Sequence, residues 1–461
     1  MITIIANEKA IKIKAGQNFE DILDEHFPDL KYVTNVVADG VLRELFEHYK
    51  DENELEFISA KTNEEAARTY ARGVSFLLYR AVKKYYHGKR KVIIDHALSG
   101  GLYCEMADGE PIVPHDVVEI ERIMGEMVEA DTNFIYNKVP KEAAIKLFEN
   151  DGQMDKVELL KYRPLSYFRY YENDGDINYF FGKMVPSTGY LKDFKLFTYA
   201  PGFIVKYPSP YQTETHVLEE EPKLAATFNR SERWARLLHV ANVADINMLE
   251  QNGELADFIK VNETLHESQL VEIVKQIVSR PQARLILIAG PSSSGKTTFA
   301  GRLRTHLKVL GKTSYSVSLD DYYIDRDKLP YDENGKQDFE TIDALDTHLF
   351  NQNMVSLLDG KETKLPIFSF SKGSREKKGR KMTLDKNALL IVEGIHGLNE
   401  ELTRLIPHEN KFKIFISPLN TLNLDNHNIV YPEDLRLLRR LVRDQRARGY
   451  EVSTTLEMWE D

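Results

Sequence analysis

A nine-residue stretch, GPSSSGKTT, runs from Gly290 to Thr298 and constrains the fold more than any other part of the sequence. It matches the pattern G-x-x-x-x-G-K-[ST], whose glycines let backbone N–H groups wrap around a phosphate. An apolar run, RLILIAG, precedes it, and apolar residues from Phe299 to Leu310 follow at helical spacing. A strand, a phosphate loop and a helix in this order predict an α/β domain built on a parallel sheet.

Three further apolar segments extend this prediction: TSYSVSL, ALLIVEG and KFKIFIS, separated by helical or irregular stretches. Short strands that alternate with helices are typical of a doubly wound sheet. Before residue 60, alternating apolar residues predict a small β-rich module with one helix. A helix is expected from Thr62 to Tyr86, with mixed structure up to residue 230 that includes a strand at INYFFGKMV. Helices are expected near 231–250 and 264–279.

Composition limits the class of protein. A length of 461 residues predicts about three domains. The formal net charge of −11 argues against bulk nucleic-acid binding, and the single cysteine, Cys104, excludes a disulfide framework. No apolar run has the length of a membrane span, and the N-terminus lacks the features of a signal peptide. We therefore expect a soluble cytoplasmic protein without a membrane partner.

The phosphate loop predicts the cofactors. Its backbone amides and the Lys296 ammonium are expected to hold ATP, and the Thr297 hydroxyl is expected to bind Mg²⁺. Glu393 ends the buried strand of LLIVEG, where a carboxylate can hold the same ion. The predicted ATP-binding residues are Gly290, Ser292, Ser293, Ser294, Gly295, Lys296, Thr297 and Thr298.

Two more segments indicate phosphate transfer. In SVSLDDYY, Asp320 lies at the carboxyl end of a strand, where it can accept a proton from an acceptor hydroxyl. Its pair with Asp321 could instead cap the next segment. Residues 432–449 predict an arginine-rich helix that closes over the phosphates, although a solvated basic face is the alternative. The predicted catalytic residues are Asp320, Lys296, Arg440, Arg443 and Arg448.

A guanine-nucleotide switch is disfavoured. No N-K-x-D segment follows the loop, and the D-x-x-G match at DENG, Asp332 to Gly335, is expected to be a surface turn.

Together the phosphate loop, DDYY, DFETIDALD, PIFSFSKGSR, IVEGIHGL and LRLLRRLVRDQRARG resemble the uridine kinase and phosphoribulokinase family over about 281–461. The resemblance implies that Asp320 is the catalytic base. It also implies that Tyr323, Glu340, Phe368 and Arg375 contact the acceptor, and that the helix arginines form a lid.

The acceptor side departs from that family. Uridine kinases carry Tyr-Asp-Phe and then His-Ser-Arg, whereas this chain has Phe368-Ser369-Phe370 and Gly373 at the histidine position. Tyr450 replaces the last lid arginine. The segment TTLEMWED lies where family members continue into further helices, which predicts an incomplete C-terminal domain.

The N-terminal half resembles another family. Residues 1–60 are similar to a TGS domain, a β-grasp fold, and 61–230 to the α+β editing domain of threonyl-tRNA synthetases, most clearly at MVPSTGYLKDFKL. That editing domain uses a pair of histidines and a second pair formed by a cysteine and a histidine. The aligned positions here are Arg72 and Phe76 for the first pair and Phe180 and Met184 for the second. The predicted domains are therefore 1–60, 61–230 without deacylase chemistry, a helical linker at 231–280, and the kinase-like domain at 281–461.

The function expected from these features is ATP-dependent phosphorylation of the 5′-hydroxyl of a uridine-like or cytidine-like nucleoside, with ATP and Mg²⁺ as cofactors. Two alternatives stay open. One is a kinase for another sugar or alcohol, and the other is a nucleotide-gated, RNA-associated regulatory protein, which the acidic charge disfavours. The sequence leaves a homo-oligomeric state open as well.

Overall fold

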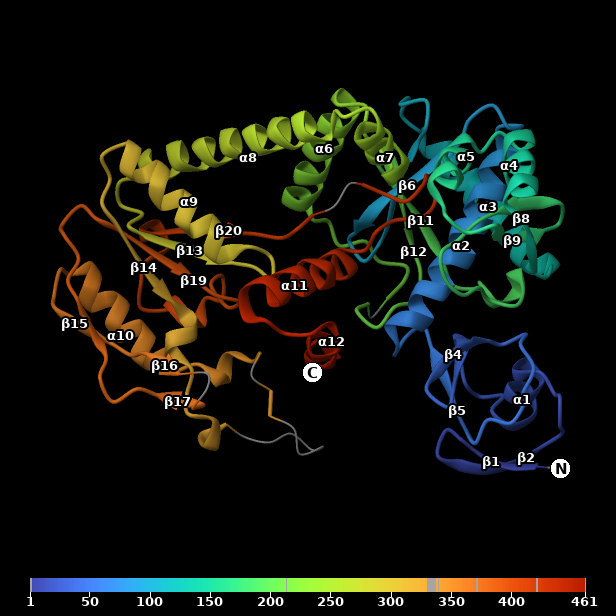
Figure 1. Cartoon of the computed structure of the whole chain (residues 1–461), viewed down its shortest axis with the longest axis horizontal. Coiled ribbons are helices and arrows are strands. Elements are labelled where there is room, and N and C mark those ends of the chain that lie inside the picture. Colours follow the sequence, from blue (N-terminus) through green and yellow to red (C-terminus); the bar gives the residue numbers. More distant parts are fainter. Residues whose placement is uncertain are drawn as a thin grey trace. The chain divides into compact units, whose positions relative to one another are not determined.

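The computed structural model describes residues 2–212, 214–329, 337–338, 340–369, 372–419 and 422–460 (Figure 1). The chain forms two compact units. Unit 1 comprises Met1–Gly253 and Asn420–Tyr431, and unit 2 comprises Glu254–Leu419 and Pro432–Asp461. The segment DENG lies outside the described residues. No helix in the described ranges is long and apolar enough to cross a membrane.

The first module of unit 1 is a five-stranded sheet in the order β2-β1-β5-β3-β4. Its strands are β1 (Ile2–Ala6), β2 (Lys9–Ile13), β3 (Val33–Ala38), β4 (Val41–Glu44) and β5 (Glu54–Ser59). Helix α1 (Phe19–His26) is capped by Asn18, whose side chain accepts a hydrogen bond from the Asp21 amide, and it packs Phe19 and Ile22 into the core. The strands and the helix expected before residue 60 are confirmed.

The larger part of unit 1 contains two antiparallel sheets with helices. One sheet has the order β11-β12-β7-β6, and the other β10-β9-β8. The strands are β6 (Val92–Leu98), β7 (Gly101–Met106), β8 (Ile135–Pro140), β9 (Tyr167–Asn173), β10 (Asp176–Asn178), β11 (Lys195–Tyr199) and β12 (Gly202–Lys206). The helices are α2 (Glu64–Tyr85), α3 (Pro114–Ala130), α4 (Lys141–Asn150), α5 (Met154–Tyr162) and the short 3₁₀ turn η1 (Thr188–Tyr190).

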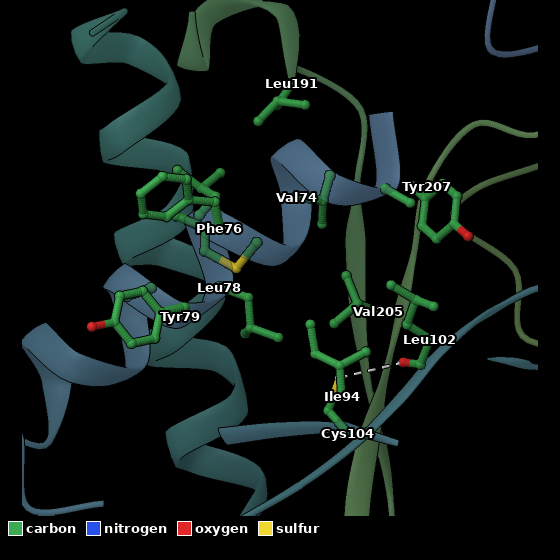
Figure 2. Close-up of a cluster of buried hydrophobic side chains, with 14 of the residues drawn as sticks. Val74, Phe76, Leu78, Tyr79, Ile94, Leu102, Cys104, Leu191, Val205 and Tyr207 are labelled. Carbon is green, nitrogen blue, oxygen red and sulfur yellow. Dashed lines mark hydrogen bonds between the residues drawn. The ribbon is translucent and has the colours of Figure 1, made fainter. Parts of the chain in front are cut away.

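The core of this part is formed between helix α2 and the β6–β7–β12 strands (Figure 2). Val74 and Leu78 from the helix lie in one cluster with Ile94, Leu102 and Val205 from the sheet. The only cysteine, Cys104, is buried there, and its thiol donates to the Leu102 carbonyl oxygen at 3.6 Å (Figure 2). Burial raises the pKa of this thiol, so it is an apolar packing residue rather than a reactive one.

The sequence-based helix assignments after residue 220 need correction. The helix expected at 231–250 is two helices, α6 (Pro222–Leu237) and α7 (Val243–Gln251). His239 has a φ of +54°, which ends the first helix, and Asn242 forms a capping box with Asp245 that starts the second. Helix α8 (Leu255–Val278) begins earlier than the expected residue 264, and the strand expected at INYFFGKMV ends at Asn178.

Unit 2 is built on a four-stranded parallel sheet in the order β14-β19-β13-β20. Its strands are β13 (Leu285–Ala289), β14 (Ser314–Ser318), β19 (Leu389–Glu393) and β20 (Lys411–Phe415). Alternate residues of β13 point to opposite faces of the sheet. Ile286 and Ile288 pack with helices α8 and α9 (Lys296–Val309), whereas Leu285 and Leu287 pack with α10 (Thr347–Leu358). The parallel α/β sheet predicted from the apolar segments is confirmed.

Further strands, 3₁₀ turns and two C-terminal helices complete unit 2. They are β15 (Thr363–Leu365), β16 (Phe368–Ser369), β17 (Ser374–Arg375), β18 (Arg380–Met382), η2 (Leu319–Tyr322), η3 (Arg326–Lys328), η4 (Ile342–Ala344), η5 (Glu401–Thr403), η6 (His408–Asn410), α11 (Pro432–Arg448) and α12 (Val452–Glu460).

The stretch 422–431 follows β20 and precedes α11 in sequence, yet it belongs to unit 1. The buried Asp425 carboxylate accepts a hydrogen bond from the Lys156 ammonium at 3.1 Å, with both side chains fully buried. Asn428 accepts from the Phe181 amide at 2.8 Å and donates to the Tyr179 carbonyl oxygen at 2.9 Å. We call 422–431 the inserted segment. Because of it, and because unit 2 begins at Glu254, the compact units differ from the continuous 281–461 domain expected from sequence.

Candidate active site

The phosphate loop connects β13 to α9, as the sequence predicts. Gly295 adopts a φ of +98°, which favours glycine, and precedes the first helical residue. At Gly290, a Cβ atom would lie 2.1 Å from the Ile416 carbonyl oxygen, so only glycine fits the close approach of β20. The Lys296 ammonium donates to the carbonyl oxygens of Gly290 and Pro291 at 2.9 and 3.1 Å. These contacts keep the loop curved around the N-terminus of helix α9, where backbone N–H groups can bind an anion.

The loop can accommodate phosphate and a metal ion. The Ser293 and Ser294 hydroxyl oxygens are buried without a hydrogen-bond partner among the described residues. The Thr297 hydroxyl donates to the Glu393 carboxylate at 3.2 Å. A hydroxyl and a carboxylate oxygen side by side are the hard ligands that Mg²⁺ prefers, so the residues present fit the predicted ion.

Two carboxylates come to the loop from neighbouring strands. Asp320 follows β14 and Glu393 ends β19, and the carboxyl ends of these parallel strands meet at one edge of the sheet. Burial raises the pKa of both groups, with the Lys296 ammonium acting in the opposite direction on each. Burial also lowers the pKa of Lys296. The pKa values of Asp320, Glu393 and Lys296 are therefore all shifted toward neutral pH, as is common at catalytic sites.

A cavity of about 850 Å³ opens in front of the loop. Tyr323 and Glu340 line it together with Asp320, so the structure brings these predicted acceptor residues to the predicted base. The Phe368 ring contacts the Tyr323 ring in a tilted arrangement, with ring centroids 5.7 Å apart and an interplanar angle of 51°. The residues that line the cavity are Ser292, Ser293, Gly295, Lys296, Thr297, Thr298, Asp320, Tyr323, Glu340, Glu393, Ile395, Leu438, Arg439, Arg440, Val442, Arg443 and Arg446.

Arg375 is directed toward the protein. Its guanidinium donates to the carbonyl oxygens of Tyr322 and Tyr323 at 2.8 and 2.9 Å and to the Asp346 carboxylate at 3.0 Å. These bonds engage the whole guanidinium fork, so Arg375 fixes the backbone that carries Tyr323. It is placed to position Tyr323, which the sequence predicts to contact the acceptor.

The arginine helix α11 contacts the phosphate loop. Arg436 and Arg439 donate through Nε to the carbonyl oxygens of Ser292 and Ser293, each at 3.1 Å. Arg440 and Arg443 line the cavity and approach the buried Asp444 carboxylate at 3.6 and 2.8 Å. The side chain of Arg448 lies outside the described residues. Sequence reasoning assigned no role to Arg439 or Asp444, although the i, i+4 spacing of Arg440 and Asp444 was a readable signal.

The four counterparts of the editing residues lie in the interior of unit 1. Phe76, Phe180 and Met184 belong to its main core, and the Phe76 and Phe180 rings lie 5.8 Å apart. The Arg72 guanidinium donates to the Lys183 carbonyl oxygen at 2.9 Å. No acid–base or metal-binding pair stands at these positions.

The loop, the strand-end carboxylates and the arginines around one cavity define the class: unit 2 is a P-loop kinase, in which catalysis depends on holding phosphates and neutralising their charge.

Residues 285–461 match the model of the phosphoribulokinase/uridine kinase family. The chain is 31% identical over 179 residues to a uridine kinase of Macrococcus caseolyticus, covering 38% of this chain and 75% of that one. The chain belongs to this family, whose members transfer phosphate to an alcohol group. A solved structure of a possible uridine kinase from Bacillus stearothermophilus is 20% identical and covers 32% of this chain and 79% of its own, with a TM-score of 0.28.

A second similarity is to a different enzyme. The chain is 29% identical over 206 residues to a threonine–tRNA ligase of Clostridium tetani. The match covers 44% of this chain and 32% of the ligase.

Proposed function

We propose that this protein is an ATP-dependent kinase that phosphorylates the 5′-hydroxyl of a nucleoside of the uridine or cytidine type. The observation that carries the proposal is the convergence of Asp320, Tyr323 and Glu340 on the cavity in front of the phosphate loop. A cavity-lining carboxylate beside two polar side chains suits an acceptor hydroxyl that must lose a proton. Uridine kinases among the curated relatives support the nucleoside.

In the proposed reaction, the acceptor oxygen bonds to the γ-phosphorus while the bond to the ADP oxygen breaks, and the hydroxyl proton moves to Asp320. Lys296, the loop amides and the arginines of α11 hold the transferred charge. Thr297 and Glu393 would hold Mg²⁺, which would supply positive charge to the same phosphates. Tyr323 and Glu340 orient the acceptor, and Arg375 keeps Tyr323 in place.

A kinase for a different sugar or alcohol is a second candidate, and Gly373 favours it. Uridine kinases carry a histidine at this position, but here the backbone has a φ of +64°. A Cβ atom at Gly373 would lie 2.6 Å from Cδ of Arg326. The base-reading histidine is therefore replaced by space that Arg326 fills, and a site without that hydrogen bond discriminates pyrimidines less.

We further propose that the N-terminal half is a TGS-like module followed by an editing-like domain that lacks deacylase activity. The threonine–tRNA ligase similarity and the apolar packing of Phe76, Phe180 and Met184 support this. A threonine tRNA that has been mischarged with serine should remain aminoacylated in the presence of the protein. Hydrolysis of its ester bond would contradict the proposal. We propose the cytoplasm as the location, since the chain has one cysteine and a metabolite kinase requires cellular ATP.

The experiment that tests the kinase is ADP release with Mg²⁺ and ATP against a panel of nucleosides, sugars and alcohols. Asp320→Asn should lower kcat by about 10²- to 10⁴-fold with ATP affinity retained. The matched control is Asp321→Asn, because Asp321 faces Arg380 at 3.8 Å and does not line the cavity. Equal losses in the two variants would refute Asp320 as the base, and turnover of a non-nucleoside alone would select the second candidate.

A further inference from the structure

A group of titratable side chains lies in unit 1, whereas the residues of the kinase site belong to unit 2. Asp95 and His96 are consecutive residues of β6, and neighbours on a regular strand point to opposite faces. Here the pairing of β6 with β7 shifts register between Ile94 and His96, so Asp95 is the extra residue of a β-bulge. The bulge brings the two side chains together, with His96 Nδ1 4.0 Å from an Asp95 carboxylate oxygen.

Helix α6 supplies a third group, Glu232. Its Oε1 lies 3.0 Å from His96 Nδ1, and one ligand atom from each of Asp95, His96 and Glu232 lies within 4.8 Å of the others. In a tetrahedral zinc site with bonds of 2.0–2.2 Å, ligand atoms are about 3.3–3.6 Å apart. The His96–Glu232 and His96–Asp95 separations, 3.0 and 4.0 Å, lie on either side of that spacing, so a small adjustment of the side chains would bring the three groups to ligand positions.

His96 and Glu232 are buried, Asp95 is partly exposed, and the hydrogen bonding of the group is incomplete. His96 is 4% exposed and Glu232 is 5% exposed. Both ring nitrogens of His96 and Oε1 of Glu232 lack a hydrogen-bond partner among the described residues. A buried polar group without a partner costs about 1–3 kcal/mol, and more when it is charged. His96 Nδ1 and Glu232 Oε1 face each other, and the unprotonated form of this ring nitrogen and the carboxylate oxygen can each donate an electron pair to a cation.

The surrounding protein fixes these groups but does not neutralise them fully. The His96 ring stacks on Phe228 of α6, with centroids 3.7 Å apart and an interplanar angle of 13°. Asn423 donates to the carbonyl oxygens of Ile94 and Asp95 at 3.2 and 2.7 Å, which holds the bulge. Arg236 donates to Glu105 at 2.6 Å and lies 3.4 Å from the other oxygen of Glu232. One arginine thus faces Glu105, Glu232 and the neighbouring Asp95.

We propose that Asp95, His96 and Glu232 bind a first-row divalent cation, with Zn²⁺ the best match to one imidazole and two carboxylates. Imidazole favours zinc over Mg²⁺, which prefers oxygen ligands, so this site and the Thr297–Glu393 pair select different metals. The cation would fasten helix α6 to the bulge of β6. Its role is structural, and phosphate transfer does not depend on its chemistry.

The test uses the tag-free full-length protein, treated with a chelator and then titrated with Co²⁺ in excess Mg²⁺. Visible d–d absorption should rise to one equivalent and disappear when Zn²⁺ is added. Glu232→Gln and His96→Gln should each weaken Co²⁺ binding at least tenfold, with circular dichroism confirming the fold. Two controls should bind Co²⁺ as the wild type does: Glu393→Gln, which alters the magnesium pair, and His216→Gln, which removes a histidine that is 66% exposed.

Absence of a bound equivalent in the wild type, or unchanged binding in Glu232→Gln, would overturn the proposal. Crystals of the wild type grown with Zn²⁺ give a measurement that needs no variant. An anomalous peak between His96 and Glu232 at the zinc edge supports the site. Anomalous peaks that occur only at other places in the protein would contradict the proposal.

Discussion

The buried ion pair between Lys156 and Asp425 gives the sharpest prediction about how the inserted segment is held. Its Nζ and Oδ1 atoms are 3.1 Å apart, and neither side chain is exposed. Asp425→Asn removes the negative charge and leaves the Lys156 ammonium with Asp155, 3.5 Å away, as its remaining carboxylate. Breaking a buried pair costs about 3–5 kcal/mol, because the abandoned charge stays in a poorly solvated place.

Because Asp155 remains, we expect the lower end of this range, a loss of about 3 kcal/mol in the free energy of unfolding of unit 1. For a unit of this size, each kcal/mol lowers Tm by about 2–4 °C, so the expected shift is about 6–12 °C. The double variant Lys156→Met with Asp425→Leu should recover part of the loss, since it removes both charges.

Denaturant and thermal unfolding of the single and double variants, followed by circular dichroism, form a double-mutant cycle. The matched control is Glu158→Gln on the same helix α5, because Glu158 pairs with Lys161 at 2.6 Å but the two side chains are 44% and 54% exposed. That control should change stability by less than about 0.5 kcal/mol. If Asp425→Asn costs no more than Glu158→Gln, the inserted segment is not held by this pair and the reasoning is refuted.

Two other predictions concern the phosphate loop and the response to acid. Gly290→Ala should weaken ATP binding at least tenfold by calorimetry, because its Cβ would meet the Ile416 carbonyl oxygen at 2.1 Å; Gly301→Ala, with open space around the new atom, should leave ATP affinity unchanged. Burial, aided by Lys156, holds the pKa of His427 well below its usual 6.5, so below that pH the unfolded chain takes up a proton that the folded chain excludes. Stability should therefore fall with decreasing pH by up to about 1.4 kcal/mol per pH unit from this group. Denaturant midpoints between pH 5 and 7 should show that slope in the wild type and a smaller one in His427→Gln; equal slopes would contradict the assignment.

The position of the phosphate loop could be predicted from the sequence, for a local reason. The phosphate loop, the strand before it and the helix after it are contiguous, so glycine spacing and apolar periodicity specify them together. Asp320 and Glu393 were predicted from their places at strand ends, and parallel strands bring such residues to one edge. The structure places both beside the loop.

What the sequence did not reveal depends on contacts between distant residues. Arg375 was expected to face the acceptor, but its direction is decided by the Tyr322 and Tyr323 carbonyl groups and by Asp346. The contact between Arg439 and the loop could not be told from a solvated basic face, since both give the same helical pattern.

The inserted segment was not predicted from the sequence either. Its sequence, LNLDNHNIVY, is polar and resembles an exposed loop, and its hydrogen bonds exist only once unit 1 has folded. The break between α6 and α7 was missed because a left-handed residue at His239 leaves little trace in the apolar pattern.

The path of the chain through 422–431 has a consequence for proteolysis and for gene rearrangement. A protease cut in the covalent link between Gly253 and Glu254 would yield two fragments, and the C-terminal fragment would still carry a stretch folded into the N-terminal unit. The fragments should therefore co-elute after cleavage. A recombination event at that boundary would deliver a kinase half whose Asp425, His427 and Asn428 have lost their partners. The two halves therefore cannot be separated by recombination at this boundary without loss of these contacts, because the segment before helix α11 folds as part of unit 1.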